Sequence, residues 1–146
     1  MLGELGSEQI ERMLQQECIG RIGCHAGGVT YVVPVTYWYD GSGVICHSRE
    51  GLKIRMMREN PNVCFEVDRM KDMTNWESVI AQGSFVELSP EDAVRAMQLF
   101  SRWLKPRMPS VTADPAHPEN PHGSPGAKAV AFRIELAEKS GRFEKR

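Results

Sequence analysis

The chain has 146 residues, the usual size of one domain, and its 41% hydrophobic and 25% charged content is that of an ordinary globular protein. A formal net charge of -1 gives no sign of a nucleic-acid or membrane partner. The amino terminus lacks the basic and apolar regions of a signal peptide, and no apolar run reaches the roughly 20 residues that span a bilayer. We therefore expect a single cytoplasmic domain over residues 1–146.

The first forty residues predict a short helix followed by a β-hairpin. Ser7 precedes a stretch in which Ile10, Met13 and Leu14 recur at helical spacing. Residues 18–39 are rich in β-branched and aromatic side chains, and Gly27-Gly28 divides them into two strands.

Two further strands and a helix follow in alternation. The turn at residues 40–43 leads into a third strand at Val44–His47. A helix over residues 50–59 then ends at Asn60-Pro61, because a residue before proline avoids the α region. Val63–Val67 forms the next strand.

The rest of the chain predicts a long strand, a helix, a loop and a closing strand. Gly83 in the strand Trp76–Leu88 suggests a bend or bulge. Ser89-Pro90 begins the helix as N-cap and first helical residue. Six prolines make residues 105–127 a loop, and Lys128–Leu136 alternates as a final strand.

About six sequential strands joined by hairpins, with three helices, predict a mainly β fold. Strands connected in this way form antiparallel sheets, and closing the sheet hides its edges. We therefore expect a small antiparallel β-barrel.

The transition from the third strand to the second helix is the segment that suggests chemistry. The free N–H groups of a helix's first turn favour an anion, and Ser48, Arg49 and Lys53 add a hydroxyl and two charges suited to phosphate. Gly51 lets a ligand approach the backbone. An ordinary capped helix with solvated charges is the alternative for these residues.

The order of several short motifs resembles the FMN-binding split-barrel family, the relatives of pyridoxamine 5'-phosphate oxidase, and within it the branch of nitroimidazole-resistance (Nim) reductases. The motifs are Pro34-Val35-Thr36-Tyr37, His47-Ser48, Glu50-Gly51-Leu52-Lys53, Asn60-Pro61 with Val63–Val67, Trp76–Ile80 and Gly83. The resemblance runs from about residue 19 to residue 88.

This resemblance implies an antiparallel Greek-key split barrel and a homodimer with FMN between the subunits. Residues matching Pro34, Val35, Thr36 and Tyr37 lie along the isoalloxazine in such proteins. Those matching His47 and Ser48 reach the flavin or its phosphate tail, the residue matching Lys53 binds the phosphate, and the one matching Ser78 lies near the flavin. The chain departs from true pyridoxamine-phosphate oxidases at Trp76–Val79 and at its carboxyl end, which disfavours oxidation of a B6 vitamer.

We therefore expect an FMN-dependent oxidoreductase that passes electrons from NAD(P)H or another donor to a small, aromatic or nitro-bearing acceptor. The flavin would carry the chemistry, with His47 as the candidate proton donor. A non-catalytic flavin- or haem-binding split barrel is the alternative, since a fold does not fix an activity.

Cysteines and histidines complete the predictions. Cys18, Cys24, Cys46 and Cys64 are single, so we expect reduced, mostly buried thiols. His25 and His47 belong to no ligand-spaced cluster, and no metal site is predicted.

Overall fold

The computed structural model describes residues 1–107 and 129–146. Its strands are β1 Leu2–Glu4, β2 Ile19–Ala26, β3 Val29–Tyr39, β4 Gly43–Arg49, β5 Asn62–Asp72, β6 Asn75–Glu87 and β7 Ala129–Glu144. Its α-helices are α1 Ser7–Gln16, α2 Leu52–Glu59 and α3 Pro90–Leu104. The described part of the chain is thus a mainly β structure with three α-helices.

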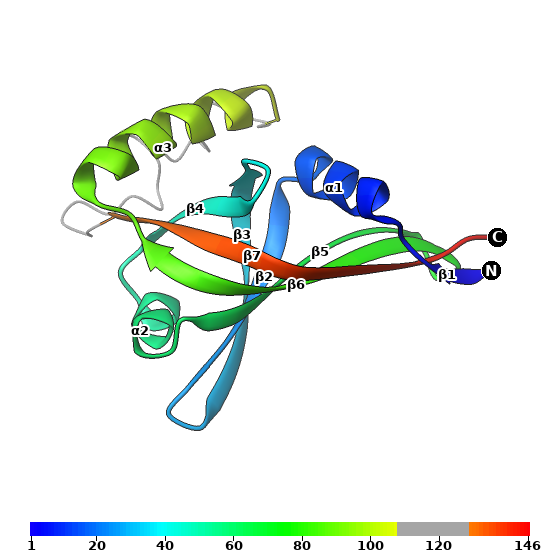
Figure 1. The fold of residues 1–146 in the computed structure, drawn as a ribbon, viewed down its shortest axis with the longest axis horizontal. Helices are drawn as coiled ribbons and strands as arrows, with labels where there is room; N and C mark the ends of the chain where they lie inside the picture. The colour runs from blue at the N-terminus through cyan, green and yellow to red at the C-terminus, as the bar shows by residue number, and fades with distance from the viewer. Residues whose placement is uncertain (108–128) are drawn as a thin grey trace.

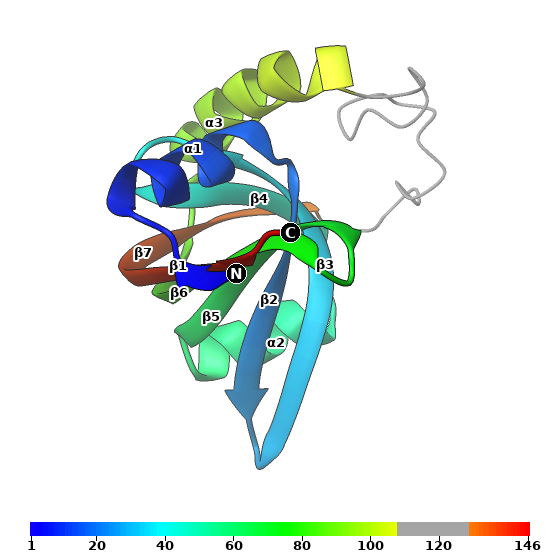
Figure 2. The ribbon, with the colours of Figure 1, turned by 90° about the vertical axis from the view of Figure 1, so that its right-hand side faces the viewer.

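The strands form a closed antiparallel barrel, as predicted. Their order is β1-β7-β4-β3-β2-β5-β6, and β6 also pairs with β7, so six strands close on themselves while β1 extends beside β7. Helices α1 and α3 lie at one end of the barrel and α2 at the other (Figure 1). The hairpin of β2 and β3 projects beyond α2 in both views (Figure 2).

Two glycine positions explain local shape. Gly27 and Gly28 have φ of 58° and 78°, the left-handed conformations that a tight hairpin turn between β2 and β3 requires. At Gly83 the register between β6 and β7 shifts, and an added Cβ would lie 2.6 Å from the Ile134 side chain and 2.7 Å from the Glu135 carbonyl oxygen. The bulge predicted at Gly83 is confirmed.

The helix ends follow local capping chemistry. Ser89 accepts a hydrogen bond from the Asp92 N–H at 3.3 Å, and Pro90 is the first helical residue of α3, as predicted. Helix α1 instead begins at Ser7 with Gly6 as its N-cap, where the Gln9 side chain accepts from the Gly6 N–H at 2.8 Å. Ser7 is therefore inside α1 rather than before it.

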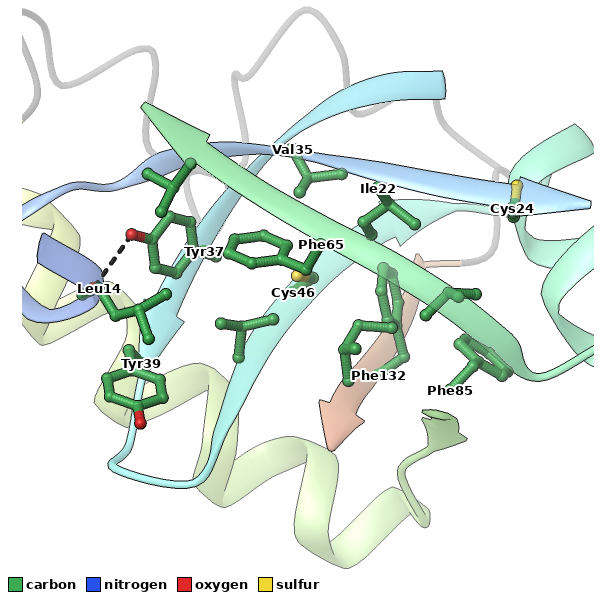
Figure 3. Packing of buried hydrophobic residues seen from close by; sticks show 14 of the residues in the cluster. Leu14, Ile22, Cys24, Val35, Tyr37, Tyr39, Cys46, Phe65, Phe85 and Phe132 are labelled. Atoms are coloured by element: carbon green, nitrogen blue, oxygen red, sulfur yellow. Dashed lines mark hydrogen bonds between the residues drawn. The ribbon is translucent and has the colours of Figure 1, made fainter. Parts of the chain in front are cut away.

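The core fills the barrel with alternating side chains from the strands and one face of α1 (Figure 3). Tyr37 and Phe65 meet edge to face with ring centroids 4.9 Å apart. Cys24 and Cys46 are buried and Cys18 and Cys64 half-buried, and all four are free thiols. The expectation of reduced thiols therefore agrees with the structure, although only two of them are fully buried.

The structure differs from the sequence predictions mainly in strand length. Strand β1 was not predicted, and β5 and β7 continue to Asp72 and Glu144 through polar residues. Of the predicted proline-rich loop, Lys105–Arg107 form a 3-10 turn and the remainder lies outside the described residues. Within the part described, none of the helices combines the length and apolarity needed to cross a membrane.

Candidate functional site

The first turn of α2 presents backbone donors at the end of β4. Gly51 is its N-cap with extended backbone, and within the described residues no side chain caps this helix. The Ser48 hydroxyl, which could have capped it, donates to the Arg49 carbonyl oxygen at 3.3 Å. The N–H groups of this turn are therefore open to an anion.

Lys53 is the second residue of this helix, and its side chain is half-buried. Burial lowers the pKa of its ammonium, an effect partly opposed by the nearby thiols of Cys46 and Cys24. No carboxylate among the described residues lies within ion-pair distance of Lys53. A desolvated cation beside open N–H groups favours a phosphate-like ligand.

Arg58 fixes α2 against the barrel. Its guanidinium donates to Glu50 at 2.6 Å and 3.0 Å and to Glu87, at the end of β6, at 2.7 Å and 2.9 Å. Bidentate pairs between an arginine and a carboxylate fix the relative orientation of the two groups and also stabilise their contact. The start of α2 is therefore held in place relative to β4 and β6.

The predicted residues of β3 divide between the two faces of the strand. Val35 and Tyr37 point into the core, with 8% and 0% of their surfaces exposed, while Pro34 and Thr36 are exposed on the outside. A strand alternates its side chains in this way. Only Pro34, Thr36 and the backbone of this segment can thus meet a ligand outside the barrel.

Strands β3 and β4 separate next to α2. They pair at Tyr37, Trp38 and Tyr39, whereas His47, Ser48 and Arg49 of β4 are paired with β7. His47 is half-buried at this separation, and burial lowers the pKa of its imidazole. The neutral ring is therefore its main form at neutral pH, which makes His47 a hydrogen-bonding group rather than a strong acid.

Ser78 lies apart from the other predicted residues. It is on β6, three strand-to-strand steps from β3 in either direction around the barrel, or about 14 Å along the sheet. Its hydroxyl donates to Glu66 at 3.5 Å, and Arg21 contacts Glu66 and Asp68 at 3.3 Å and 3.0 Å. The structure brings together residues of β3, β4 and α2 but not Ser78.

A groove of about 540 Å³ occupies another part of the surface, between α1, β1 and the outer faces of β6 and β7. Ser78 lines it together with Leu5, Trp76, Ile80, Lys139 and Arg142. No short stretch of the sequence indicates this groove, because it forms only where β1, a strand that the sequence does not predict, pairs with β7. We call it the β6–β7 groove.

Comparison with known proteins identifies the family. The pyridoxamine 5'-phosphate oxidase family matches residues 6–143, nearly the whole chain. The chain belongs to this family. A crystal structure of a FAD-binding protein from Mesorhizobium loti, at 27% identity, superposes with a TM-score of 0.75 and covers 99% of both chains. An uncharacterized protein of Rhizobium meliloti (strain 1021) is 28% identical over 139 residues, 89% of this chain and 92% of the relative.

A third relative shares the family's fold. The crystal structure of a putative 5-nitroimidazole antibiotic resistance protein from Bacteroides thetaiotaomicron has a TM-score of 0.71 at 20% identity, covering 98% of this chain and 87% of that one. At this identity the likeness shows the fold alone. The predicted split barrel of the pyridoxamine 5'-phosphate oxidase family is confirmed, while the roles of individual site residues stay predictions.

Proposed function

We propose that the protein is a flavin-dependent oxidoreductase that binds the flavin phosphate at the first turn of α2. The observation that carries the proposal is the open helix start beside Lys53, a half-buried cation without a carboxylate partner among the described residues. FMN is the proposed cofactor. Because the Mesorhizobium loti relative is FAD-binding, FAD, which contains the same flavin phosphate, is the second candidate.

The residues at this place fit a phosphate. An added Cβ at Gly51 would meet only the Arg49 carbonyl oxygen, at 3.9 Å, so the space beside the helix start is open. Lys53 and the N–H groups of α2 would bind the phosphate, and the Ser48 hydroxyl could turn toward it from the Arg49 carbonyl oxygen. When bound, the flavin supplies the electron transfer, and the chain binds it, orients it and limits its contact with water.

For the ring, the outer face of β3 is the proposed support. Pro34 and Thr36 are exposed there, and the backbone of Val35 and Tyr37 runs between them. The neutral His47 would hydrogen-bond at the separation of β3 and β4. Electrons would pass from a reduced nicotinamide to a small aromatic or nitro-bearing acceptor, as proposed for a Nim-like branch.

A homodimer forms part of the proposal. Ser78 is three strands from β3, so a second copy is the simplest way for both to contact one flavin. Exposed apolar side chains on the outer faces of β2, β3 and β6 support this: Ile19, Val32 and Ile80 are 59%, 61% and 43% exposed. A dimer formed through this surface would cover these side chains.

The absorption spectrum of the purified protein tests the function. We expect a flavin spectrum that bleaches with NADH or NADPH and recovers on adding a nitroaromatic compound. Chromatography of the released cofactor distinguishes FMN from FAD, and light scattering should give twice the chain mass of 16.4 kDa. A flavin that no donor reduces would make the protein a binding module, and a Soret band would indicate haem. Colourless protein that takes up neither FMN nor FAD would overturn the proposal.

A further inference from the structure

A small basic pocket lies where β5, β6 and β7 extend together beyond the barrel (Figure 1). It has a volume of about 240 Å³, and its basic side chains are Arg69, Lys71, Lys145 and Arg146. Among the described residues, Glu77 is the one acid in its lining. We call it the hairpin-tip pocket, because it lies beside the turn that joins β5 to β6.

The hairpin-tip pocket opens on the face of the sheet that continues the core side of the barrel. Side chains alternate along a strand, so Glu77 shares the face of the fully buried Val79, while Ser78 belongs to the opposite face. Phe143, which pairs with Glu77, packs against the core. The pocket is therefore separate from the outer faces proposed for the flavin and for the dimer.

Arg69 forms a fixed wall of the pocket. Its guanidinium donates to Glu17 at 2.7 Å and to Gln16 at 3.1 Å, both at the carboxyl end of α1, and lies 3.6 Å from Glu77. These carboxylates balance its charge. The positive charge available to a ligand therefore comes from the other basic side chains.

Lys71 and Lys145 supply that charge from two different strands. The register between β5 and β6 shifts between Met70 and Asp72, which makes Lys71 the extra residue of a β-bulge. Within the described residues, Lys71 makes no ion pair or hydrogen bond. Lys145 is 61% exposed, and its ammonium lies 3.9 Å from the Glu77 carboxylate.

Asn75 holds the two sides of the pocket together. Its amide N–H group donates to Asp72 at 2.9 Å and 3.1 Å, and its carbonyl oxygen accepts from the Arg146 N–H at 3.2 Å. The hairpin turn is thereby joined to the carboxyl end of β7. Lys71 and Lys145 are thus kept beside one space.

We propose that the hairpin-tip pocket binds a phosphate monoester group. A phosphate dianion has three acceptor oxygens, which suit two ammonium groups better than the single charge of a carboxylate does. The pocket is smaller than the roughly 300–1,000 Å³ of sites that enclose whole small molecules, so it holds the charged group and leaves the rest of the ligand outside. Soluble phosphate esters and the headgroup of a phosphomonoester lipid share this chemistry.

An NMR titration of the full-length protein with glycerol 3-phosphate tests this site. The backbone amides of Lys71 and Asn75 should shift in a saturable way, and acetate should bind more weakly. Followed at the Asn75 amide, Lys71→Gln and Lys145→Gln should each weaken binding by about two- to fivefold, as expected for exposed charges. Glu77→Gln should strengthen it, because the opposing charge is removed.

Two controls separate this pocket from other cations. The shifts at Lys71 and Asn75 should be the same in Lys53→Ala, which lacks the lysine of the proposed flavin phosphate site. Lys105→Gln, an exposed lysine of the 3-10 turn, should leave the affinity unchanged. Absence of a saturable shift, its loss in Lys53→Ala, equal affinity for acetate, or equal effects of Lys71→Gln and Lys105→Gln would each overturn the proposal. No flavin is needed, so a failed flavin proposal would not be mistaken for a failed pocket.

Vesicles distinguish the two sources of the phosphate group. Co-sedimentation with phosphatidylcholine vesicles that contain phosphatidic acid, lost in the Lys71→Gln, Lys145→Gln double variant, would support a lipid headgroup. Saturable binding of glycerol 3-phosphate without co-sedimentation would support a soluble ester.

Discussion

The Tyr37 hydroxyl donates a hydrogen bond of 3.0 Å to the Leu14 carbonyl oxygen and so joins β3 to α1 inside the core (Figure 3). Both residues are fully buried, and burial raises the pKa of Tyr37 well above its usual range. This side chain stabilises the barrel and cannot contact a ligand on the outer face of β3. The next residue toward the amino terminus, Thr36, is exposed on the outer face and can contact such a ligand.

Tyr37→Phe should reduce the free energy of unfolding by about 1–3 kcal/mol, because the buried Leu14 carbonyl oxygen loses its donor. Urea denaturation measures this loss. Flavin affinity should stay unchanged. A weaker flavin affinity with unchanged stability would mean that Tyr37 acts at the cofactor instead.

Gly83→Ala should destabilise the protein by about 1–3 kcal/mol, because the new methyl group would overlap Ile134 and the Glu135 backbone. Gly23→Ala on β2 is the matched control, since an added Cβ there meets its nearest atom at 3.8 Å. Thermal unfolding of the two variants should separate them clearly. Equal stability would show that the β6–β7 bulge adapts to the methyl group.

Ser89→Ala should cost about 1 kcal/mol, the usual effect of removing an N-cap side chain. Ser7→Ala should cost less, because Ser7 is already inside α1 and Gly6 is the N-cap. Chemical denaturation compares the two. A larger loss for Ser7→Ala would contradict the helix starts described above.

Glu66 should make stability depend on pH. Burial, together with the neighbouring Asp68, raises the pKa of the Glu66 carboxyl, against the opposing effect of Arg21. Its contribution to stability is therefore present below the ordinary glutamate pKa and is lost as pH rises through its folded-state pKa. Glu66→Gln removes this dependence, so the stability of the variant relative to wild type should increase with pH.

Urea unfolding of the flavin-free protein, from below the ordinary glutamate pKa to neutral pH, measures this change in relative stability. Glu91→Gln, on an exposed part of α3, is the control. The control should follow the wild type at every pH. A relative stability of Glu66→Gln that falls with rising pH would show that the pairing with Arg21 dominates instead.

The sequence predicts the elements whose causes are local. The paired glycines at 27 and 28, the capped start at Ser89 and the alternating apolar side chains of the last strand each depend on a few neighbouring residues, and the structure has all three features. The polar ends of β5 and β7 could not be foreseen, because pairing across the barrel holds them rather than any apolar pattern.

The same difference between local and long-range causes applies to the candidate site. Lys53 and the helix start are adjacent in sequence, so a lysine beside the first turn of α2 could be predicted, while anion binding there stays a prediction. The separation of Ser78 from β3 follows from the order of the strands, and the β6–β7 groove requires β1 to pack on β7. Neither relationship is present in any short stretch of the chain.

The most direct test of the central claim is the affinity of Lys53→Ala for FMN and for riboflavin, measured by fluorescence titration with Lys105→Ala as control. If α2 binds the flavin phosphate, Lys53→Ala should weaken FMN binding by about 1.5–3 kcal/mol, a charge-assisted contact, and leave riboflavin binding unchanged. Equal losses for FMN and riboflavin, or no loss for either, would contradict a phosphate site at the first turn of α2.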